Sequence, residues 1–219
     1  GRKRAEIQGA EEKLKELKAL RGLIGYWKFD EGTGTVAKDS SGNGHDGVLT
    51  GAPSWVPGRA GGALSFDGKD DVVTVPFDPS FNALPMTITV WLMGQKPAGP
   101  VVSRYQSGSG NGYVFELGNA MVWSGGGSTT RINQWSISAG PWCHLAFRVD
   151  AEGSKIWMNG ALKASAPWNG KPNAPTSTKE LLVGCYYGNQ FARIDALDEL
   201  RIYNRALKED EIAALAGAK

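Results

Sequence analysis

The sequence lacks any long hydrophobic run and any large excess of charge of one sign. Its 219 residues include no stretch of about 18 or more apolar residues, so no segment is expected to span a membrane. The 24 basic and 22 acidic side chains give a formal net charge of only +2. A nucleic-acid reader needs a concentrated basic face that displaces counterions. We therefore expect neither a membrane span nor a nucleic-acid partner.

Cysteine is also scarce. Cys143 and Cys185 are the only two, and their spacing fits no zinc-binding pattern. Two alternatives stay open, which are a disulfide formed in an oxidising compartment or two buried thiols. No signal peptide is visible, and the basic opening at residues 1–4 suggests a fragment excised from a larger protein. The missing signal peptide therefore does not decide the compartment.

The residues that are present divide into two parts, and the first is a short helical segment. Over residues 5–21, Leu14, Leu17 and Leu20 form a narrow apolar stripe at helical spacing, flanked by Glu and Lys. A helix of this length is marginal on its own. We expect a linker helix over residues 1–22, with a dimer-forming coiled-coil stub as the alternative.

The second part, residues 23–219, has the pattern of one all-β domain. Short apolar runs recur between clusters of Gly, Pro, Asn, Asp and Ser, as in a sandwich or barrel. Asn159-Gly160 supplies the two positive-φ residues of a type I′ hairpin turn, and Glu152-Gly153 marks the turn before it. Residues 144–165 should therefore form three antiparallel strands. A short terminal helix is expected over 206–217, with Ile212 and Leu215 packed on the body.

Seven short motifs follow one another along residues 23–216. They are WKFDEGTGT from Trp27, DSSGNGHDG from Asp39, ALSFDG from Ala63, ITVW from Ile88, WCHLA from Trp142, IWMNG from Ile156 and IDALDELRIYNRAL from Ile194. Their order resembles that of the laminin-G-like jelly-roll domains of the concanavalin A-like lectin/glucanase superfamily. The resemblance implies an antiparallel jelly-roll β-sandwich and usually a structural calcium ion. It also implies use as an adhesive or carbohydrate-binding part of extracellular bacterial proteins.

The second motif has the spacing of a calcium loop. Asp39, Ser41 and Asn43 place oxygen-bearing side chains at alternate positions, and Gly44 permits a sharp reversal. The backbone carbonyl of His45 would be the next ligand. The same residues are also ordinary turn chemistry, with Asx caps and glycines and no ion.

A single carboxylate is too little charge for a divalent ion, and Asp198 is the best candidate for a second one. It shares strand parity with Ile194, Leu200 and Ile202, so period-2 alternation points it toward the core, although Leu197 is out of phase. A buried carboxylate needs a metal or several hydrogen bonds. The predicted ligands of a structural Ca²⁺ are Asp39, Ser41, Asn43, His45 and Asp198.

Residues that would carry catalysis are missing from the pattern. A sugar-cleaving enzyme needs two carboxylates within about 5–9.5 Å of each other. The nearest pair, Asp195 and Glu199, lies about 13 Å apart by the strand rise. His144 begins a strand and is interpreted as structural, and Asp70-Asp71 is expected to face solvent in a turn. We predict no catalytic residues, and an enzyme would require carboxylates brought together from different strands.

Aromatic residues are plentiful, with eight Trp among them. Sugars are held by flat aromatic faces and a few fixed polar partners. Four tryptophans lie in or beside apolar runs and are interpreted as core residues: Trp27, Trp91, Trp142 and Trp157. Trp123, Trp135 and Trp168 lie outside clean strand patterns. The predicted ligand-binding residues are Tyr105, Trp123, Trp168, Tyr186, Tyr187, Asn189 and Gln190.

Together these observations predict a non-catalytic carbohydrate-binding or adhesive module. Its expected partners are a poly- or oligosaccharide and the other domains of a larger parent protein. Its expected location is extracellular, on the cell surface or periplasmic. A protein-interaction or spacer domain without a sugar site is the first alternative, and a polysaccharide-cleaving enzyme is the second.

Overall fold

The computed structural model describes residues 4, 7–9, 20–124, 127–137 and 140–217. The predicted N-terminal helix therefore lies mostly outside the described residues. The strands are β1 (Leu23–Trp27), β2 (Val36–Ala37), β3 (Gly47–Thr50), β4 (Ser54–Pro57), β5 (Gly62–Asp67), β6 (Val72–Val75), β7 (Met86–Gly94), β8 (Gly99–Gln106), β9 (Asn111–Leu117), β10 (Asn119–Trp123), β11 (Thr129–Asn133), β12 (Gly140–Asp150), β13 (Gly153–Met158), β14 (Ala161–Ala166), β15 (Leu181–Val183), β16 (Cys185–Tyr186), β17 (Gln190–Phe191) and β18 (Arg193–Tyr203). Two short helices are η1 (Pro79–Asn82) and α2 (Glu209–Gly217).

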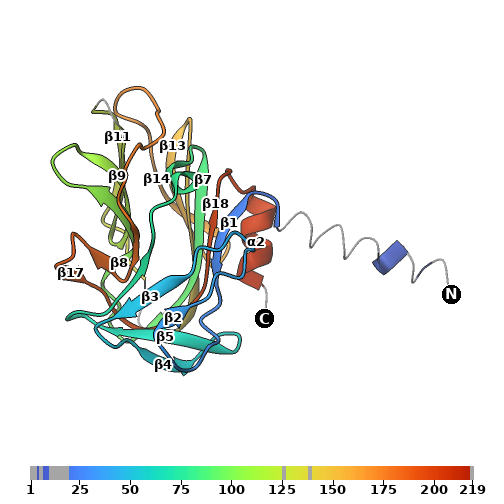
Figure 1. The fold of residues 1–219 in the computed structure, drawn as a ribbon. Helices are drawn as coiled ribbons and strands as arrows, with labels where there is room; N and C mark the ends of the chain where they lie inside the picture. The colour runs from blue at the N-terminus through green and yellow to red at the C-terminus, as the bar shows by residue number, and fades with distance from the viewer. Residues whose placement is uncertain (1–3, 5–6, 10–19, 125–126, 138–139, 218–219) are drawn as a thin grey trace.

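The strands build two antiparallel sheets of eight strands each, laid face to face (Figure 1). The first sheet has the order β14-β13-β12-β7-β18-β5-β4, and β1 also pairs with β18. The second sheet has the order β11-β10-β9-β8-β15-β6-β3-β2, and β16 and β17 form a separate hairpin. This arrangement confirms the predicted antiparallel jelly-roll β-sandwich.

The core lies between the inner faces of the two sheets. Phe115 on β9 stacks on Phe147 on β12 with ring centroids 5.2 Å apart, which joins the second sheet to the first. Trp135 also stacks on Phe115, with ring centroids 5.8 Å apart, and is only 7% exposed. Trp135 lies outside the strands, as its sequence setting indicated, yet it fills the core because this loop residue after β11 turns inward.

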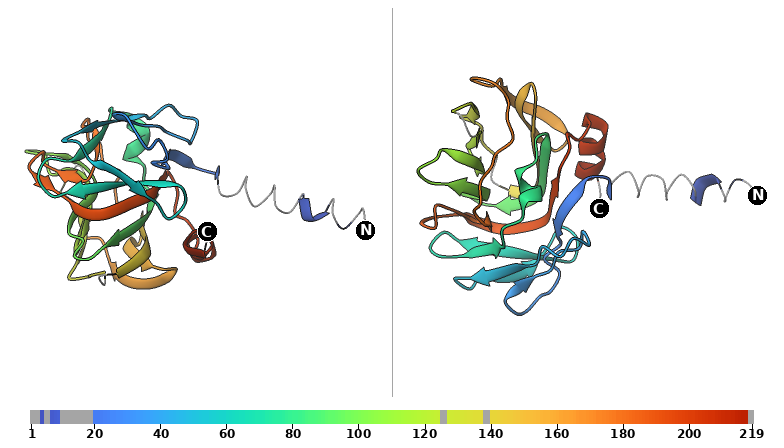
Figure 2. Two further views of the ribbon diagram at one scale, coloured as in Figure 1. Left: turned by 90° about the horizontal axis from the view of Figure 1, so that it is seen from below. Right: turned by 45° about the horizontal axis from the view of Figure 1, so that its top comes forward.

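Helix α2 covers part of the outer face of the first sheet (Figure 2), where outer means turned away from the other sheet. Ile212 is fully buried, together with Ala146, Trp157 and Tyr203 of the sheet, and Leu215 is partly buried beside them. The predicted packing of Ile212 and Leu215 on the body is confirmed.

The predicted Asn159-Gly160 turn is confirmed, whereas the turn before it lies one residue earlier than predicted, at Ala151–Glu152, because Asp150 pairs with Gly153 at the start of β13. Met158 pairs with Ala161, and between them Asn159 and Gly160 have φ of 50° and 80°, the positive values that a type I′ turn requires. Of the two alternatives for the cysteines, the structure shows two buried thiols and not a disulfide, because Cys143 and Cys185 are both free and buried. Within the described ranges, no helix is long and apolar enough to cross a membrane.

Candidate functional site

Four aromatic side chains from three elements meet on the outer face of the second sheet. The ring of Tyr105, near the end of β8, lies 4.6 Å from Trp123 on β10 and 4.9 Å from Tyr187, measured between ring centroids. Tyr186 lies 5.6 Å from Tyr105 and 4.4 Å from Tyr187. We call these four residues the aromatic cluster. All four belong to the ligand-binding set predicted from the sequence.

A glycine on β9 lets the two strands on either side bring their rings together. Gly112 pairs with Trp123 on one side and with Tyr105 on the other. Its φ of 125° is one that glycine adopts readily, and an added Cβ would lie 1.9 Å from the carbonyl oxygen of Arg104. Because no side chain stands between them, the rings of Trp123 and Tyr105 touch across the intervening strand.

The β16–β17 hairpin supplies the other two rings by folding over β8. Ser103 Oγ donates to the carbonyl of Cys185 at 2.6 Å, and the Gly184 N–H donates to the carbonyl of Val101 at 3.1 Å. Tyr187 occupies the hairpin tip with φ of 61°, a left-handed conformation that is uncommon for a bulky residue. Its side chain remains 48% exposed. The hairpin therefore presents Tyr187 to solvent beside the Tyr105 ring.

A hollow of about 250 Å³ opens beside the cluster. It is lined by Ser103, Tyr105, Ser107, Lys179, Glu180, Leu182, Tyr187 and Gly188. Its volume lies just below the range of about 300–1,000 Å³ that is usual for drug-sized ligands, so it suits one small cyclic unit. The lining combines aromatic faces with hydroxyl groups, one ammonium and one carboxylate. We call this hollow the pocket.

Arg104 holds the segment that carries the charged side of the pocket. It is fully buried, and its guanidinium donates to the carbonyls of Lys179 and Ser177, both at 2.8 Å, and to Asn82 Oδ1 at 2.9 Å. Burial lowers the pKa of Arg104 below its ordinary value. Sequence analysis did not identify Arg104 as a supporting residue, because its three acceptors lie far from it along the chain.

The phenol groups of Tyr105 and Tyr186 stay neutral near neutral pH. The hydrogen bond with Tyr187, followed by burial, raises the pKa of Tyr105 to about 12. Burial, followed by the neighbouring tyrosines, raises the pKa of Tyr186 above its ordinary value. Neutral phenols offer a ring face and a hydroxyl that both donates and accepts. The cluster can therefore stack on an apolar face and hydrogen-bond to hydroxyl groups together.

The remaining predicted ligand residues divide into two groups. Asn189 and Gln190 lie on the exposed side of the same hairpin, close to the cluster. Trp168 lies elsewhere, because its ring packs against the core and its Nε1 donates to the carbonyl of Asp150 at 2.8 Å. Trp168 makes no ring contact with the four cluster residues, so the structure does not bring it into the site.

The predicted calcium loop is held by its own hydrogen bonds. The side chain of Asp39 is buried and accepts from the N–H groups of Tyr26, Ser41 and His45 and from the Ser41 hydroxyl. Burial alone would raise its pKa, but these bonds outweigh burial and lower it. A carboxylate has about four lone-pair sites, and Asp39 uses four. The loop as it stands fits the ion-free turn better than a calcium ligand set.

The other loop positions are engaged in the same way. Asn43 Nδ2 donates to the carbonyls of Leu23 and Ile24, at 3.2 and 3.3 Å, and to Ser41 Oγ at 3.0 Å. The His45 carbonyl, expected to face an ion, accepts from Trp27 Nε1 at 2.9 Å. Calcium at this loop stays a prediction.

Asp198 is buried, but its side chain does not point to the core. Register shifts on both sides of it, with Glu199 at φ 56°, place Leu197 in the core and Asp198 opposite Trp91. The neighbours of Trp91 along β7 both face the core, so Trp91 and Asp198 lie on the outer face. The period-2 prediction for Asp198 is therefore wrong, because these irregularities break the alternation.

Asp198 and Asp39 have different hydrogen-bond partners. Its Oδ2 accepts from the N–H groups of Arg59 and Ala60, at 2.7 and 3.0 Å, while Oδ1 has no hydrogen-bond partner of normal geometry. Burial raises the pKa of Asp198 to about 6, assisted by Glu199. An unpaired buried carboxylate oxygen is chemically suited to a cation, so Asp198 is the predicted ligand that retains capacity for one.

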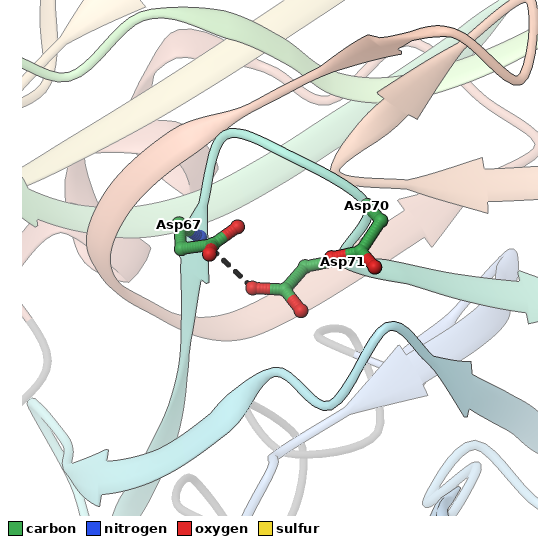
Figure 3. Close-up of side chains that lie close together, drawn as sticks. All are labelled: Asp67, Asp70 and Asp71. Atoms are coloured by element: carbon green, nitrogen blue, oxygen red, sulfur yellow. Dashed lines mark hydrogen bonds between the residues drawn. The ribbon is translucent and has the colours of Figure 1, made fainter.

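Three acidic side chains converge in the β5–β6 turn, which Figure 3 shows in close-up. Among the described residues, only Asp67, Asp70 and Asp71 form a group of His, Cys, Asp or Glu whose ligand atoms all lie within 4.8 Å. Asp71 is 4% exposed and accepts from the Asp67 N–H at 2.9 Å. The expectation that Asp71 faces solvent is wrong, because its carboxylate closes the turn. Asp67 pairs with Lys69 at 2.9 Å, so turn geometry accounts for the group.

The carboxylates nearest to a catalytic pair are both engaged in structural contacts. Asp195 Oδ2 accepts from the Gln95 N–H at 2.8 Å, and Glu199 accepts from the Tyr26 hydroxyl at 2.8 Å and pairs with Arg201. His144 is 1% exposed and packs edge-on against Trp91 at 5.3 Å. This placement agrees with the structural role predicted for His144.

Comparison with known families now identifies the chain. Residues 67–213 match a laminin-G family model described as the concanavalin A-like lectin/glucanases superfamily. The chain belongs to this family. None of the curated proteins is similar enough in sequence to serve as a relative.

Solved structures share the fold of this laminin-G domain. Domain 4 of AbnA, an extracellular GH43 arabinanase from Geobacillus stearothermophilus solved with arabinotriose, has a TM-score of 0.69 and 20% identity over 89% of this chain and 98% of its own. The binding domain of Paraclostridial Mosquitocidal Protein 1 has a TM-score of 0.70 and 19% identity over 90% of this chain. Trypanosoma rangeli sialidase, solved with the inhibitor DANA, has a TM-score of 0.64 and 16% identity over 89% of this chain.

The three structures differ in how much of their own length this chain covers. The laminin-G domain spans nearly all of AbnA domain 4, but 52% of the mosquitocidal binding domain and 32% of the sialidase chain. At such low sequence identities the likeness shows the fold alone.

Proposed function

We propose that this laminin-G domain is a non-catalytic carbohydrate-binding module of an extracellular, cell-surface or periplasmic protein, and that it binds sugar at the aromatic cluster and the pocket. The observation that carries the proposal is the convergence of Tyr105, Trp123, Tyr186 and Tyr187 from three separate elements. Scattered surface aromatics are common, but four rings joined through contacts with Tyr105 beside a pocket form an organised surface.

The chemistry of the pocket suits a sugar ring. A pyranose or furanose has an apolar C–H side that stacks on an aromatic face, and Tyr105 and Tyr187 offer such faces. Its hydroxyl groups need donors and acceptors, which Ser107, Lys179 and Glu180 supply in the same pocket. A sugar bound in the pocket would replace water both on the aromatic faces and at the polar groups.

Two features of the comparison support this class of ligand. AbnA domain 4 covers nearly the same length as this domain and was solved with a neutral trisaccharide. It belongs to an extracellular enzyme, which supports a location outside the cell. A non-catalytic role is supported by the structural hydrogen bonds that occupy Asp195 and Glu199.

Calorimetry against a panel of polysaccharides tests the proposal. The parent should bind at least one of arabinan, xylan, β-glucan, polygalacturonate and heparin without releasing reducing ends. Tyr105→Ala and Tyr187→Ala should each weaken binding about tenfold, because a stacked ring contributes about 1–2 kcal/mol. Leu162→Ala is the matched control, since Leu162 is 51% exposed and lies on β14 of the other sheet.

Two results would contradict the proposal. If the parent binds no member of the panel, a protein-interaction or spacer role takes its place. If Tyr105→Ala and Tyr187→Ala stay folded and bind like the parent, the sugar site lies elsewhere on the sandwich. Release of reducing ends by the purified domain would remove the non-catalytic part of the proposal.

A further inference from the structure

A row of uncharged side chains leads away from the pocket across the second sheet. Leu182 on β15 lines the pocket and pairs with Thr74 on β6. Thr74 pairs in turn with Val48 on β3, and Val48 pairs with Val36 on β2. Directly opposed residues of antiparallel strands share a face, so these four side chains form one row. We call them the uncharged row.

The uncharged row faces solvent. The residues next to it along the strands, Leu181, Val183, Val73 and Leu49, are buried in the core between the sheets. Successive side chains of a strand point to opposite faces, so the row points outward. Val48 is 52% exposed, and the other three members are partly exposed.

The length of this surface exceeds that of one sugar unit. From Tyr105 on β8 to Val36 on β2 the sheet order crosses four strand spacings, which amount to about 19 Å at about 4.8 Å each. The pocket at one end suits a single ring, and the row continues from it without a change of sheet. A linear chain of several sugars would match this length.

The charge distribution favours a neutral ligand. The row itself carries only Val, Leu and Thr side chains. Beyond its far end Lys38 and Asp46 pair with each other at 2.7 Å, and at the pocket Lys179 stands beside Glu180. Neither end therefore presents net charge of one sign, which complementarity to an acidic polymer would require.

We infer that the sugar site extends from the pocket along the uncharged row and takes an internal stretch of a neutral polysaccharide. One unit stacks on Tyr105 and Tyr187 in the pocket, and the following units lie over Leu182, Thr74 and Val48. The C–H faces of the sugars meet Leu and Val side chains, and the Thr74 hydroxyl meets a sugar hydroxyl. This inference rests on the proposed sugar site and adds its ligand class and its direction.

A length series tests the extension. Oligosaccharides of two to six units, prepared from the neutral polysaccharide that binds best and starting with arabino-oligosaccharides, are titrated by calorimetry. Affinity should rise about tenfold or more from the disaccharide to the hexasaccharide, as further units gain apolar contact. Polygalacturonate and heparin should bind more weakly than the neutral polymer at the same salt concentration.

A charged substitution on the uncharged row tests whether the longer oligosaccharides contact that row. Val48→Lys should lower affinity for the hexasaccharide about fivefold, by removing apolar contact and adding a side chain to the path, and leave the disaccharide unchanged. Leu162→Lys introduces the same side chain at an equally exposed position of the first sheet and should change neither. Val48 lies on an exposed face, so its variant should keep the parent melting temperature.

The outcomes separate this inference from the proposed function. Equal affinity across the length series overturns the extension but leaves the sugar site at the cluster. A Val48→Lys variant that binds the hexasaccharide like the parent, or that weakens both ligands equally, also overturns it. A parent that prefers an acidic polymer overturns the neutral class. A parent that binds no polysaccharide removes the proposed function itself.

Discussion

Tyr105 and Tyr187 stand with their ring centroids 4.9 Å apart, although one lies near the end of β8 and the other at the tip of the β16–β17 hairpin. Their contact depends on the position of the hairpin over the sheet. The hairpin approaches closely because Gly184 at its base has φ of 80° and no Cβ. An added Cβ there would lie 2.4 Å from the Phe66 ring.

Gly184→Ala should therefore displace the hairpin and separate the two rings. We expect a loss of about 2–4 kcal/mol in the free energy of unfolding, from the left-handed backbone and the clash together. Sugar binding should fall in the same variant. Gly188→Ala is the matched control, because Gly188 also has a positive φ but an added Cβ would meet nothing within 4 Å. Equal destabilisation of the two variants, measured by urea unfolding, would contradict the argument.

His144 should make the domain less stable in mild acid. Burial, followed by the charge of Arg201, lowers the pKa of His144 from its ordinary 6.5 to about 4. Between these two values the unfolded chain binds the proton more readily, so stability is lost as pH falls from about 6.5 toward 4. The difference in pKa corresponds to about 3 kcal/mol.

The variant His144→Phe keeps an aromatic ring against Trp91 and removes the titrating group. Its melting temperature should fall less than that of the parent between pH 6.5 and 4. Asp198 acts in the opposite direction over part of this range, because its raised pKa makes the folded state bind the proton more tightly. The comparison between parent and variant cancels that contribution. Identical pH profiles for the two proteins would show that His144 does not titrate as described.

Asp39 should stabilise the loop after β2 whether or not calcium is present. Asp39→Ala removes a buried acceptor of four hydrogen bonds and leaves the N–H groups of Tyr26, Ser41 and His45 without it. We expect a loss of about 2–3 kcal/mol, which lowers the melting temperature by about 5–10 °C in a domain of this size. The loss should be the same in EDTA and in calcium. A loss seen only in calcium would instead make Asp39 a metal ligand.

Of the five calcium ligands predicted from the sequence, Asp198 should matter most for binding the ion, because its Oδ1 has no hydrogen-bond partner of normal geometry. An ion that binds only the folded state at about 100 times its dissociation constant adds about 2.7 kcal/mol. Calcium added to EDTA-treated protein should raise the melting temperature of the parent and not that of Asp198→Asn. In EDTA at pH 7 the same variant should be at least as stable as the parent, because it removes a buried charge whose pKa is about 6. No response of the parent to calcium would remove the ion from the prediction.

The sequence was sufficient to predict the sandwich and the four members of the aromatic cluster, but not their contacts. Asn159-Gly160 and the alternating runs specify hairpins locally, so they could be identified without tertiary information. The two tyrosines and two amides of the 186–190 segment pointed to an exposed loop before the last strand. What brings Tyr105 and Trp123 to that loop is the pairing of β8, β9 and β10 through Gly112. That pairing is visible only in the folded sheet.

The errors have one physical origin, which is a local break in a regular pattern. Period-2 alternation predicts the face of Asp198 only while the strand is regular, and β18 is irregular on both sides of that residue. Asp71 lies in a turn whose polar composition suggested exposure, yet its carboxylate closes the turn, and Trp135 lies in a connection but fills the core. The local composition shows that a residue lies in a loop. It does not show whether that loop turns the side chain into the core or toward solvent.

The position of α2 has a consequence for how the domain would be displayed. Both β1 and α2 belong to the side of the first sheet, whereas the β16–β17 hairpin lies on the opposite side of the sandwich (Figure 1). A domain attached to a surface through α2 would therefore present the rings of Tyr105 and Tyr187 away from that surface. Many copies attached in this way would form an array of outward-facing rings. Such an array would bind a long polymer through several domains at once, and its avidity would then rise with the number of domains per unit of surface.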